Sequence, residues 1–242
     1  MDIAAHIEAL EDEGGRLAAA AGAASLNDPV PGCPDWAVRD LVQHIGYVHR
    51  WAAAIVSGRL DGPNGDADAV VGPLPDDARL LDWYGDGHRE LVATLRGAPA
   101  DLECFTFLPA PSPLAFWARR QALETAVHHA DAAAAAGQPA SFTDELAHDG
   151  IDETLRGFGT RPRAFEPGSI WLQPGDGPGW RIELHEEGAT STQDADAEGA
   201  DVTVAGSPTD IYLWLWNRPA RVDITGDAAV AERWKKIRVR WS

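Results

Sequence analysis

The sequence has little cysteine, no long apolar segment and no basic leader, and each absence excludes a class of protein. Its two cysteines, Cys33 and Cys104, are too few for a disulfide framework or a zinc–cysteine cage, which indicates a reducing cytoplasm. No apolar run approaches the roughly 20 residues of a membrane-spanning helix. The first residues, Met1–Glu8, lack the basic and apolar segments of a signal peptide. We therefore expect a cytoplasmic protein with no membrane partner.

Positive charge is also scarce. The chain has 20 Lys and Arg residues against 38 Asp and Glu residues, for a net charge of −18. Such an acidic surface repels phosphate backbones, so we expect no nucleic-acid partner. Its 242 residues, 45% hydrophobic and 24% charged, predict a globular chain with one large domain or two ordinary ones.

The first 137 residues have the pattern of four helices, with apolar residues at helical spacing and Gly or Pro at the ends. The expected helices are Ile3–Ala21, Val38–Ser57, Asp77–Arg96 and Pro113–Ala136. Asp35 is the candidate N-cap of the second helix, and Asp61–Pro75 is expected to be a long loop. Gly14 and Gly15 weaken the middle of the first helix. Four helices with polar outer faces predict a four-helix bundle.

Beyond residue 140 the pattern changes to mixed helices and strands. Alternating β-branched and aromatic residues predict strands at Ser169–Gln173, Trp180–His185, Asp201–Ala205 and Arg221–Thr225. Helices are expected at Thr143–Phe158, Thr209–Trp216 and Asp227–Lys236, and a flexible loop at Glu187–Ala200. The sequence therefore predicts a two-domain α+β protein, with a helical bundle over residues 1–140 and a small α+β domain over residues 141–242.

Ionisable residues line one face of the fourth helix. Arg120, Glu124, His128 and Asp131 follow one another at offsets of four, four and three, which places them one above the other. Glu124 and His128 have the spacing with which one helix can bind a divalent metal, although a surface ion pair has the same spacing. Hydropathy leaves open which side of this helix faces the core.

His44 adds a third candidate ligand from the second helix. It stands among Leu41, Ile45 and Val48 on an otherwise apolar face, as a buried core histidine also would. Together with Glu124 and His128 it would form a two-histidine, one-glutamate set with a position left for water or substrate. That set is typical of catalytic rather than structural zinc sites.

Two segments that contain these residues resemble the mycothiol-dependent maleylpyruvate isomerase family, within the wider DinB-like metalloenzyme superfamily. They are WAVRDLVQH at residues 36–44 and RQALETAVHHAD at residues 120–131. The C-terminal segments YLWLWNR at residues 212–218 and VDITGD at residues 222–227 are similar to the second domain of that family. The resemblance implies a DinB-like four-helix bundle with a metal site, followed by a C-terminal α+β domain.

The resemblance also implies roles for particular residues. His44, Glu124 and His128 would bind a divalent metal, most commonly zinc, and mycothiol or a similar low-molecular-weight thiol would be the cosubstrate. An arginine of the C-terminal domain is expected to bind a carboxylate. Arg218, after the Trp-rich helix, matches this arginine best, with Arg221 as the alternative.

The chain departs from the family after its last ligand. The family commonly has His-Arg-Trp-Asp there, whereas this chain has His128, His129, Ala130 and Asp131, which predicts a different border to the metal. His129 lies about 100° around the helix from His128 and is expected at the surface or between domains. Asp131 either orients His128 or is an ordinary surface carboxylate. Cys33 and Cys104 lack a neighbouring histidine motif and are expected to be inert small core residues.

These observations favour a metal-dependent enzyme that acts on a small electrophile with a thiol. The reaction is either cis–trans isomerisation by thiolate addition and elimination or transfer of the thiol to the electrophile. The alternatives are a non-catalytic metal- or ligand-binding protein of stress response or detoxification, and a structural module that dimerises through its bundle. Either a monomer or a homodimer is compatible with the sequence. Trp214, Trp216 and Trp234 are expected in the C-terminal core rather than in a ligand pocket.

Overall fold

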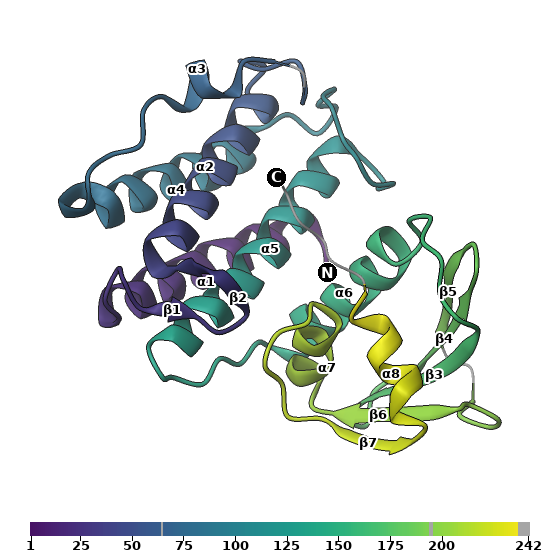
Figure 1. The fold of residues 1–242 in the computed structure, drawn as a ribbon. Helices are drawn as coiled ribbons and strands as arrows, with labels where there is room; N and C mark the ends of the chain where they lie inside the picture. The colour runs from purple at the N-terminus through teal and green to yellow at the C-terminus, as the bar shows by residue number, and fades with distance from the viewer. Residues whose placement is uncertain (64, 194–195, 237–242) are drawn as a thin grey trace. The chain divides into compact units, whose positions relative to one another are not determined.

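Four long helices dominate the first of the two units of the chain (Figure 1). The units are Met1–Ser141 and Phe142–Ser242. The computed structural model describes residues 1–63, 65–193 and 196–236. The long helices are α1 (Ile3–Ala23), α2 (Val38–Val56), α4 (Leu80–Gly97) and α5 (Pro113–Ala135). Helix α1 packs on α4 and α5, and α2 packs on α4 and α5, so the predicted bundle is confirmed. Within the described residues, no helix is both long enough and apolar enough to cross a membrane.

Side chains cap the N-terminal ends of two of these helices, α1 and α5, and the caps of α2 and α4 make no side-chain hydrogen bond. The side chains of Asp2 and Ser112 accept hydrogen bonds from the first turns of α1 and α5. The expectation that Asp35 caps α2 is wrong, because residues Cys33–Ala37 form strand β2, which pairs with β1 (Pro29–Val30). Helix α2 begins after Ala37, whose N–H donates to the Asp40 carboxylate at 2.8 Å.

The expected loop after α2 contains a short helix of its own. Helix α3 (Ala67–Val71) begins where the Asp66 carboxylate accepts a hydrogen bond from the Ala69 N–H. A 3₁₀ turn, Asp77–Arg79, then leads into α4. Val71 is the buried residue of α3. With only that one side chain buried, α3 is too short for the 3.6-residue period to mark it in the sequence.

Helix α5 is buried on every side, which is why hydropathy could not assign it a core face. Along Arg120–Ala133 both the alanine-rich side and the ionisable side are buried. Small side chains at Ala118, Ala122 and Ala126 leave room for neighbouring helices to approach closely. The ionisable row is therefore inside the protein, where each charged group requires a partner.

Gly14 gives α1 space for a side chain of α4. A Cβ atom at this position would lie 2.2 Å from His88 Nε2, which is hydrogen-bonded to the Leu10 carbonyl at 3.0 Å. The Tyr84 hydroxyl donates to the Gly14 carbonyl at 3.1 Å. Nothing lies within 4 Å of a Cβ atom at the exposed neighbour Gly15. The two glycines that weaken α1 thus have different surroundings.

These surroundings predict opposite effects for two matched substitutions. Gly14→Ala is expected to lower the free energy of unfolding by about 2 kcal/mol, because the methyl group displaces His88 from a tightly packed contact. Gly15→Ala is expected to raise it by about 0.5–1 kcal/mol, because alanine favours an exposed helix position. Denaturant unfolding of the two variants measures both effects. Equal changes in the two would contradict the packing role of Gly14.

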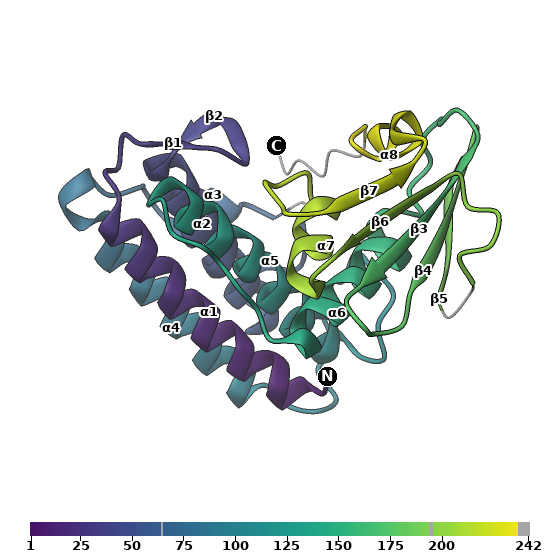
Figure 2. The same ribbon diagram turned by 90° about the horizontal axis from the view of Figure 1, so that it is seen from below.

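The second unit is built on a five-stranded mixed sheet of order β5-β4-β3-β6-β7 (Figure 2). Its strands are β3 (Gly168–Pro174), β4 (Trp180–His185), β5 (Gly188–Gln193), β6 (Val202–Gly206) and β7 (Asp223–Gly226). Strands β3 and β6 are parallel, and the other neighbours are antiparallel. Its helices are α6 (Asp144–Glu153), extended by a π-helical turn over Thr154–Phe158, α7 (Pro208–Leu215) and α8 (Ala228–Trp234). The α+β class is confirmed.

The expectation of a loop over Glu187–Ala200 is wrong for its first half. Strand β5 pairs with β4 along its whole length, from Gly188 opposite His185 to Gln193 opposite Trp180. Gly188 adopts a φ of 152°, which permits the tight turn between the two strands. Glycine, alanine and polar residues obscure this edge strand in the sequence; residues 194–195 lie outside the described part.

One face of the sheet carries the core of the second unit. Strands β3 and β6 contact α7 and α8, and the buried side chains of this face on β3, β4 and β6 are Ile170, Leu172, Ile182, Leu184, Val202 and Val204. Trp214 and Trp234 are buried and stack with ring centroids 6.5 Å apart. The Trp234 indole donates to the Leu215 carbonyl at 3.0 Å. The core role predicted for these two tryptophans is confirmed, whereas Trp216 is half-buried and donates to Thr154.

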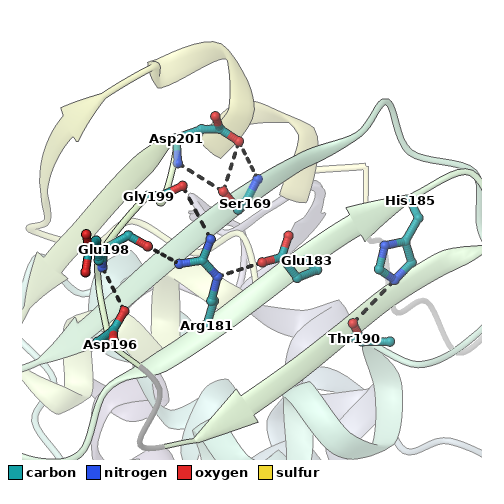
Figure 3. Close-up of polar contacts among 9 residues, drawn as sticks. All are labelled: Ser169, Arg181, Glu183, His185, Thr190, Asp196, Glu198, Gly199 and Asp201. Atoms are coloured by element: carbon teal, nitrogen blue, oxygen red, sulfur yellow. Dashed lines mark hydrogen bonds and ion pairs between the residues drawn. The ribbon is translucent and has the colours of Figure 1, made fainter.

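Polar side chains join the strands on the other face (Figure 3). The Arg181 guanidinium donates to Glu183 at 2.6 Å and to the Glu198 carbonyl at 2.8 Å. The Asp201 carboxylate accepts from the Ser169 N–H and hydroxyl at 2.7 and 3.0 Å, and the Ser169 hydroxyl accepts from the Asp201 N–H. The hydrogen bonds from the Ser169 N–H and hydroxyl lower the pKa of Asp201. The polar contacts on this face join the loop before β6 to β3 and β4.

Candidate metal centre

Helices α2 and α5 bring the three predicted ligands together. His44 Nε2 lies 3.7 Å from Glu124 Oε1, and His128 Nε2 lies 3.9 Å from the same oxygen. The two imidazole rings are 5.1 Å apart at their centroids and meet edge to face. One donor atom from each residue lies within 4.8 Å of the others. Residues 80 positions apart in the sequence thus form one cluster.

This donor set fits a divalent metal of the zinc type. Two imidazole nitrogens and one carboxylate oxygen are the ligands of many catalytic zinc sites. Donors about 2.1 Å from a tetrahedral metal lie about 3.4 Å apart, so the observed separations require only small side-chain adjustments. Glu124 and His128 are buried, and the His44 side chain is 18% exposed, so the cluster is accessible on the His44 side.

Arg120 keeps Glu124 ionised and oriented. Its Nε atom lies 3.3 Å from Glu124 Oε2, and the arginine is only 1% exposed. Burial alone would raise the pKa of Glu124, but the interaction with His44 and the charge of Arg120 outweigh burial and lower this pKa to about 2. The carboxylate is therefore charged at neutral pH. One of its oxygens faces Arg120, and the other faces the two imidazoles.

His128 is held in the form that a ligand requires. Burial lowers its pKa, and the hydrogen bond with Asp131 opposes that shift only in part. The ring is therefore neutral at neutral pH, with Nδ1 3.0 Å from Asp131 Oδ2. Asp131 contacts His128 and is only 1% exposed, so it is not an ordinary surface carboxylate.

Strand β2 contributes two side chains that the sequence did not assign to the site. The Trp36 ring lies 4.9 Å from the His44 ring and 6.1 Å from the His128 ring, between centroids. The Cys33 thiol donates to Asp131 Oδ2 at 3.8 Å. Cys33 is partly exposed, packs against the bundle core and contacts the Asp131 carboxylate, and its expected inertness stays a prediction. For Cys104, also partly exposed, burial raises the pKa of the thiol, which makes it a poor nucleophile.

His129 is buried, contrary to the expectation of a surface residue, and it is not part of the candidate metal cluster, as its place around the helix predicts. It is 7% exposed, and its Nδ1 atom is 2.6 Å from Glu13 Oε2 on α1. Arg16 lies 3.3 Å from the other oxygen of Glu13. His129 therefore joins α5 to α1 through Glu13. No sequence signal linked it to Glu13.

Arg218 and Arg221 lie in the second unit, whereas the three candidate ligands lie in the first. Helix α7 ends before Asn217, which has a φ of 58°, and the next N–H, of Arg218, donates to the Leu213 carbonyl at 2.9 Å. The Arg218 guanidinium donates to the Trp216 carbonyl at 2.9 Å, and the residue is half-buried. Arg221 is exposed, and its N–H donates to Asp210 at 2.8 Å.

Comparisons with known proteins agree with both units. Residues 7–133 match the family model described as the mycothiol maleylpyruvate isomerase N-terminal domain, and residues 145–233 match the MDMPI C-terminal domain. Two similar solved structures are a mycothiol-dependent maleylpyruvate isomerase and a histidine-to-alanine mutant of that isomerase. Their TM-scores are 0.63 and 0.65, at 13% and 12% identity, with 93% of each chain covered. A comparison with curated proteins finds no match.

Proposed function

Because this chain belongs to the mycothiol maleylpyruvate isomerase family, we propose that it is a metal-dependent enzyme that joins a low-molecular-weight thiol to a small electrophile. Mycothiol is the proposed thiol, and zinc is the proposed metal. The observation that carries the proposal is the cluster of His44, Glu124 and His128, whose donor atoms lie within 4.8 Å of one another. The two free cysteines support a reducing cytoplasm as the place of action.

His44, Glu124 and His128 would hold the metal and leave a position for a further ligand. A bound divalent metal lowers the pKa of a coordinated thiol below its free value of about 8.5, so that the nucleophilic thiolate forms at neutral pH. Arg120 holds one oxygen of Glu124, which keeps the other directed at the two imidazoles. The neutral ring of His128 keeps the Nε2 lone pair available, because Nδ1 is engaged by Asp131.

Two reactions follow from one activated thiolate. In isomerisation the thiolate adds to an activated cis double bond, the former double bond rotates as a single bond, and elimination of the thiolate gives the trans alkene. In transfer the carbon–sulfur bond persists, and the adduct is protonated or expels another leaving group. Arg218 is proposed to bind a carboxylate of the thiol or of the electrophile, since guanidinium groups bind carboxylates through paired hydrogen bonds.

The test compares zinc-loaded protein, chelator-treated protein and His44→Ala protein with mycothiol and a panel of electrophiles. Maleylpyruvate is the first substrate, followed by other cis-alkene dicarboxylates and reactive alkylating compounds. We expect turnover only with the zinc-loaded wild type. Loss of the cis alkene with no thiol consumed identifies an isomerase, and stoichiometric consumption of thiol identifies a transferase. Equal rates for zinc-loaded wild type and His44→Ala across the panel would contradict the proposed metal-dependent activity and favour a non-catalytic binding protein.

A further inference from the structure

We propose that Asp131 is a positioning residue that fixes the orientation and tautomer of His128 for the metal, with the Cys33 thiol in a lesser supporting role. This inference rests on the proposed function, because it concerns the same metal centre. Asp131 is the fourth ionisable residue of the α5 row, one turn beyond His128. Neither the family match nor the ligand set assigns it a role.

The two ring nitrogens of His128 have different neighbours. Nδ1 lies 3.0 Å from Asp131 Oδ2, while Nε2 faces Glu124 Oε1 at 3.9 Å. With the Asp131 carboxylate as the acceptor of this hydrogen bond, Nδ1 carries the hydrogen. The Nε2 lone pair is then directed at the cluster. A neutral histidine free to exchange tautomers would present that lone pair only part of the time.

The surroundings of Asp131 keep it in place. The residue is 1% exposed, and its Oδ2 atom also accepts a hydrogen bond from the Cys33 thiol at 3.8 Å. Cys33 belongs to β2, whereas His128 and Asp131 belong to α5, so this carboxylate oxygen links the β1–β2 hairpin to the ligand helix. A thiol is a weak donor, so its contribution is expected to be smaller than that of the Asp131–His128 bond.

The chain provides a matched control on the adjacent residue. His129 also has its Nδ1 atom against a buried carboxylate, Glu13 Oε2, at 2.6 Å. Glu13 is 3% exposed, comparable with Asp131. The two carboxylate–histidine pairs share burial and chemistry, but only His128 faces the other ligands. A loss of stability alone would appear in both pairs, whereas a loss of metal binding would appear only at Asp131.

The experiment measures zinc affinity by competition with a chromophoric chelator, the visible spectrum of the cobalt-substituted protein, and thermal unfolding of the metal-free protein. Asp131→Ala is expected to weaken zinc binding by about 10- to 100-fold. Asp131→Asn keeps an oxygen that can accept from Nδ1 and is expected to show a smaller loss. Both variants are expected to shift the cobalt absorption bands. Glu13→Gln is expected to lower thermal stability and leave zinc affinity and the cobalt spectrum unchanged.

Cys33→Ser retains a donor and is expected to bind zinc as the wild type does, whereas Cys33→Ala is expected to fall between the wild type and Asp131→Ala. If Asp131→Ala does not fold, Asp131→Asn provides the comparison. Wild-type affinity and an unchanged cobalt spectrum in the Asp131 variants would overturn the positioning role, as would an equal loss in Glu13→Gln. Unaltered binding by Cys33→Ala would remove Cys33 from the proposal. Failure of the wild type to bind zinc would instead overturn the proposed function.

Discussion

His128→Ala is expected to reduce the bound metal from about one ion per chain to background, and thiol turnover to the rate without protein. Three protein ligands leave two after this substitution, His44 and Glu124, whose Nε2 and Oε1 atoms lie 3.7 Å apart. Two ligands rarely retain zinc against competing water and buffer. Removal of the metal also removes the activation of the thiol, since the proposed chemistry uses no protein base.

Elemental analysis and the turnover assay measure the two losses together. The control is His129→Gln, one residue along the same helix, which keeps a hydrogen-bonding group against Glu13 and removes no proposed ligand. Far-ultraviolet circular dichroism checks that α5 remains helical in both variants. Because alanine at position 128 leaves the buried Asp131 carboxylate without the imidazole, His128→Gln serves as a second variant in which a polar side chain remains.

Retention of about one zinc ion by both variants of His128 would contradict the ligand assignment. Loss of zinc from His129→Gln to the same extent would show that helix packing, and not ligation, controls the metal content. The expected pattern is that substitution of His128 removes the zinc, whereas substitution of the adjacent His129, which has similar burial, leaves the zinc bound.

Helical periodicity accounts for part of the candidate metal centre. Glu124 and His128 are four residues apart on one helix, so their proximity follows from the helix alone. His44 joined them through the family resemblance, and the packing of α2 on α5 accounts for it physically. The long helices and strands β3, β4 and β6 likewise begin and end within a few residues of their predicted bounds.

The contacts that surround the centre could not be predicted, because they join distant segments of unremarkable composition. Glu13 and His129 are 116 residues apart, and Cys33 and Asp131 are 98 residues apart. Strands β1 and β2 contain prolines at exposed positions and have no alternating pattern, so the hairpin that carries Cys33 and Trp36 left no period-two signal. Burial of α5 on both sides removed the polar face by which a helix is usually oriented.

Arg218 has surroundings that suit a carboxylate-binding role. Its guanidinium donates to the Trp216 carbonyl at 2.9 Å, and Arg218 directly follows Asn217, the residue with a positive φ after α7. Trp216 is in turn fixed by a hydrogen bond to Thr154 at 2.9 Å and by an edge-to-face contact with Phe158, whose ring centroid is 5.4 Å away. A guanidinium that is already oriented loses less side-chain entropy when it binds an anion.

Arg218→Ala is therefore expected to lower kcat/KM for a carboxylate-bearing electrophile by about 10²-fold, a typical cost of removing one partner of a desolvated charge pair. The melting temperature is expected to change by about 2 °C or less, because the hydrogen bond from its backbone N–H to Leu213 remains. Arg221→Ala is the matched control, since that side chain is exposed and the hydrogen bond of Arg221 to Asp210 comes from its backbone N–H. The assay compares a dicarboxylate with its neutral ester, and only the dicarboxylate should lose rate in Arg218→Ala. A large loss of stability with unaltered kcat/KM would make Arg218 a structural residue, and the same loss of rate in Arg221→Ala alone would transfer the role to Arg221.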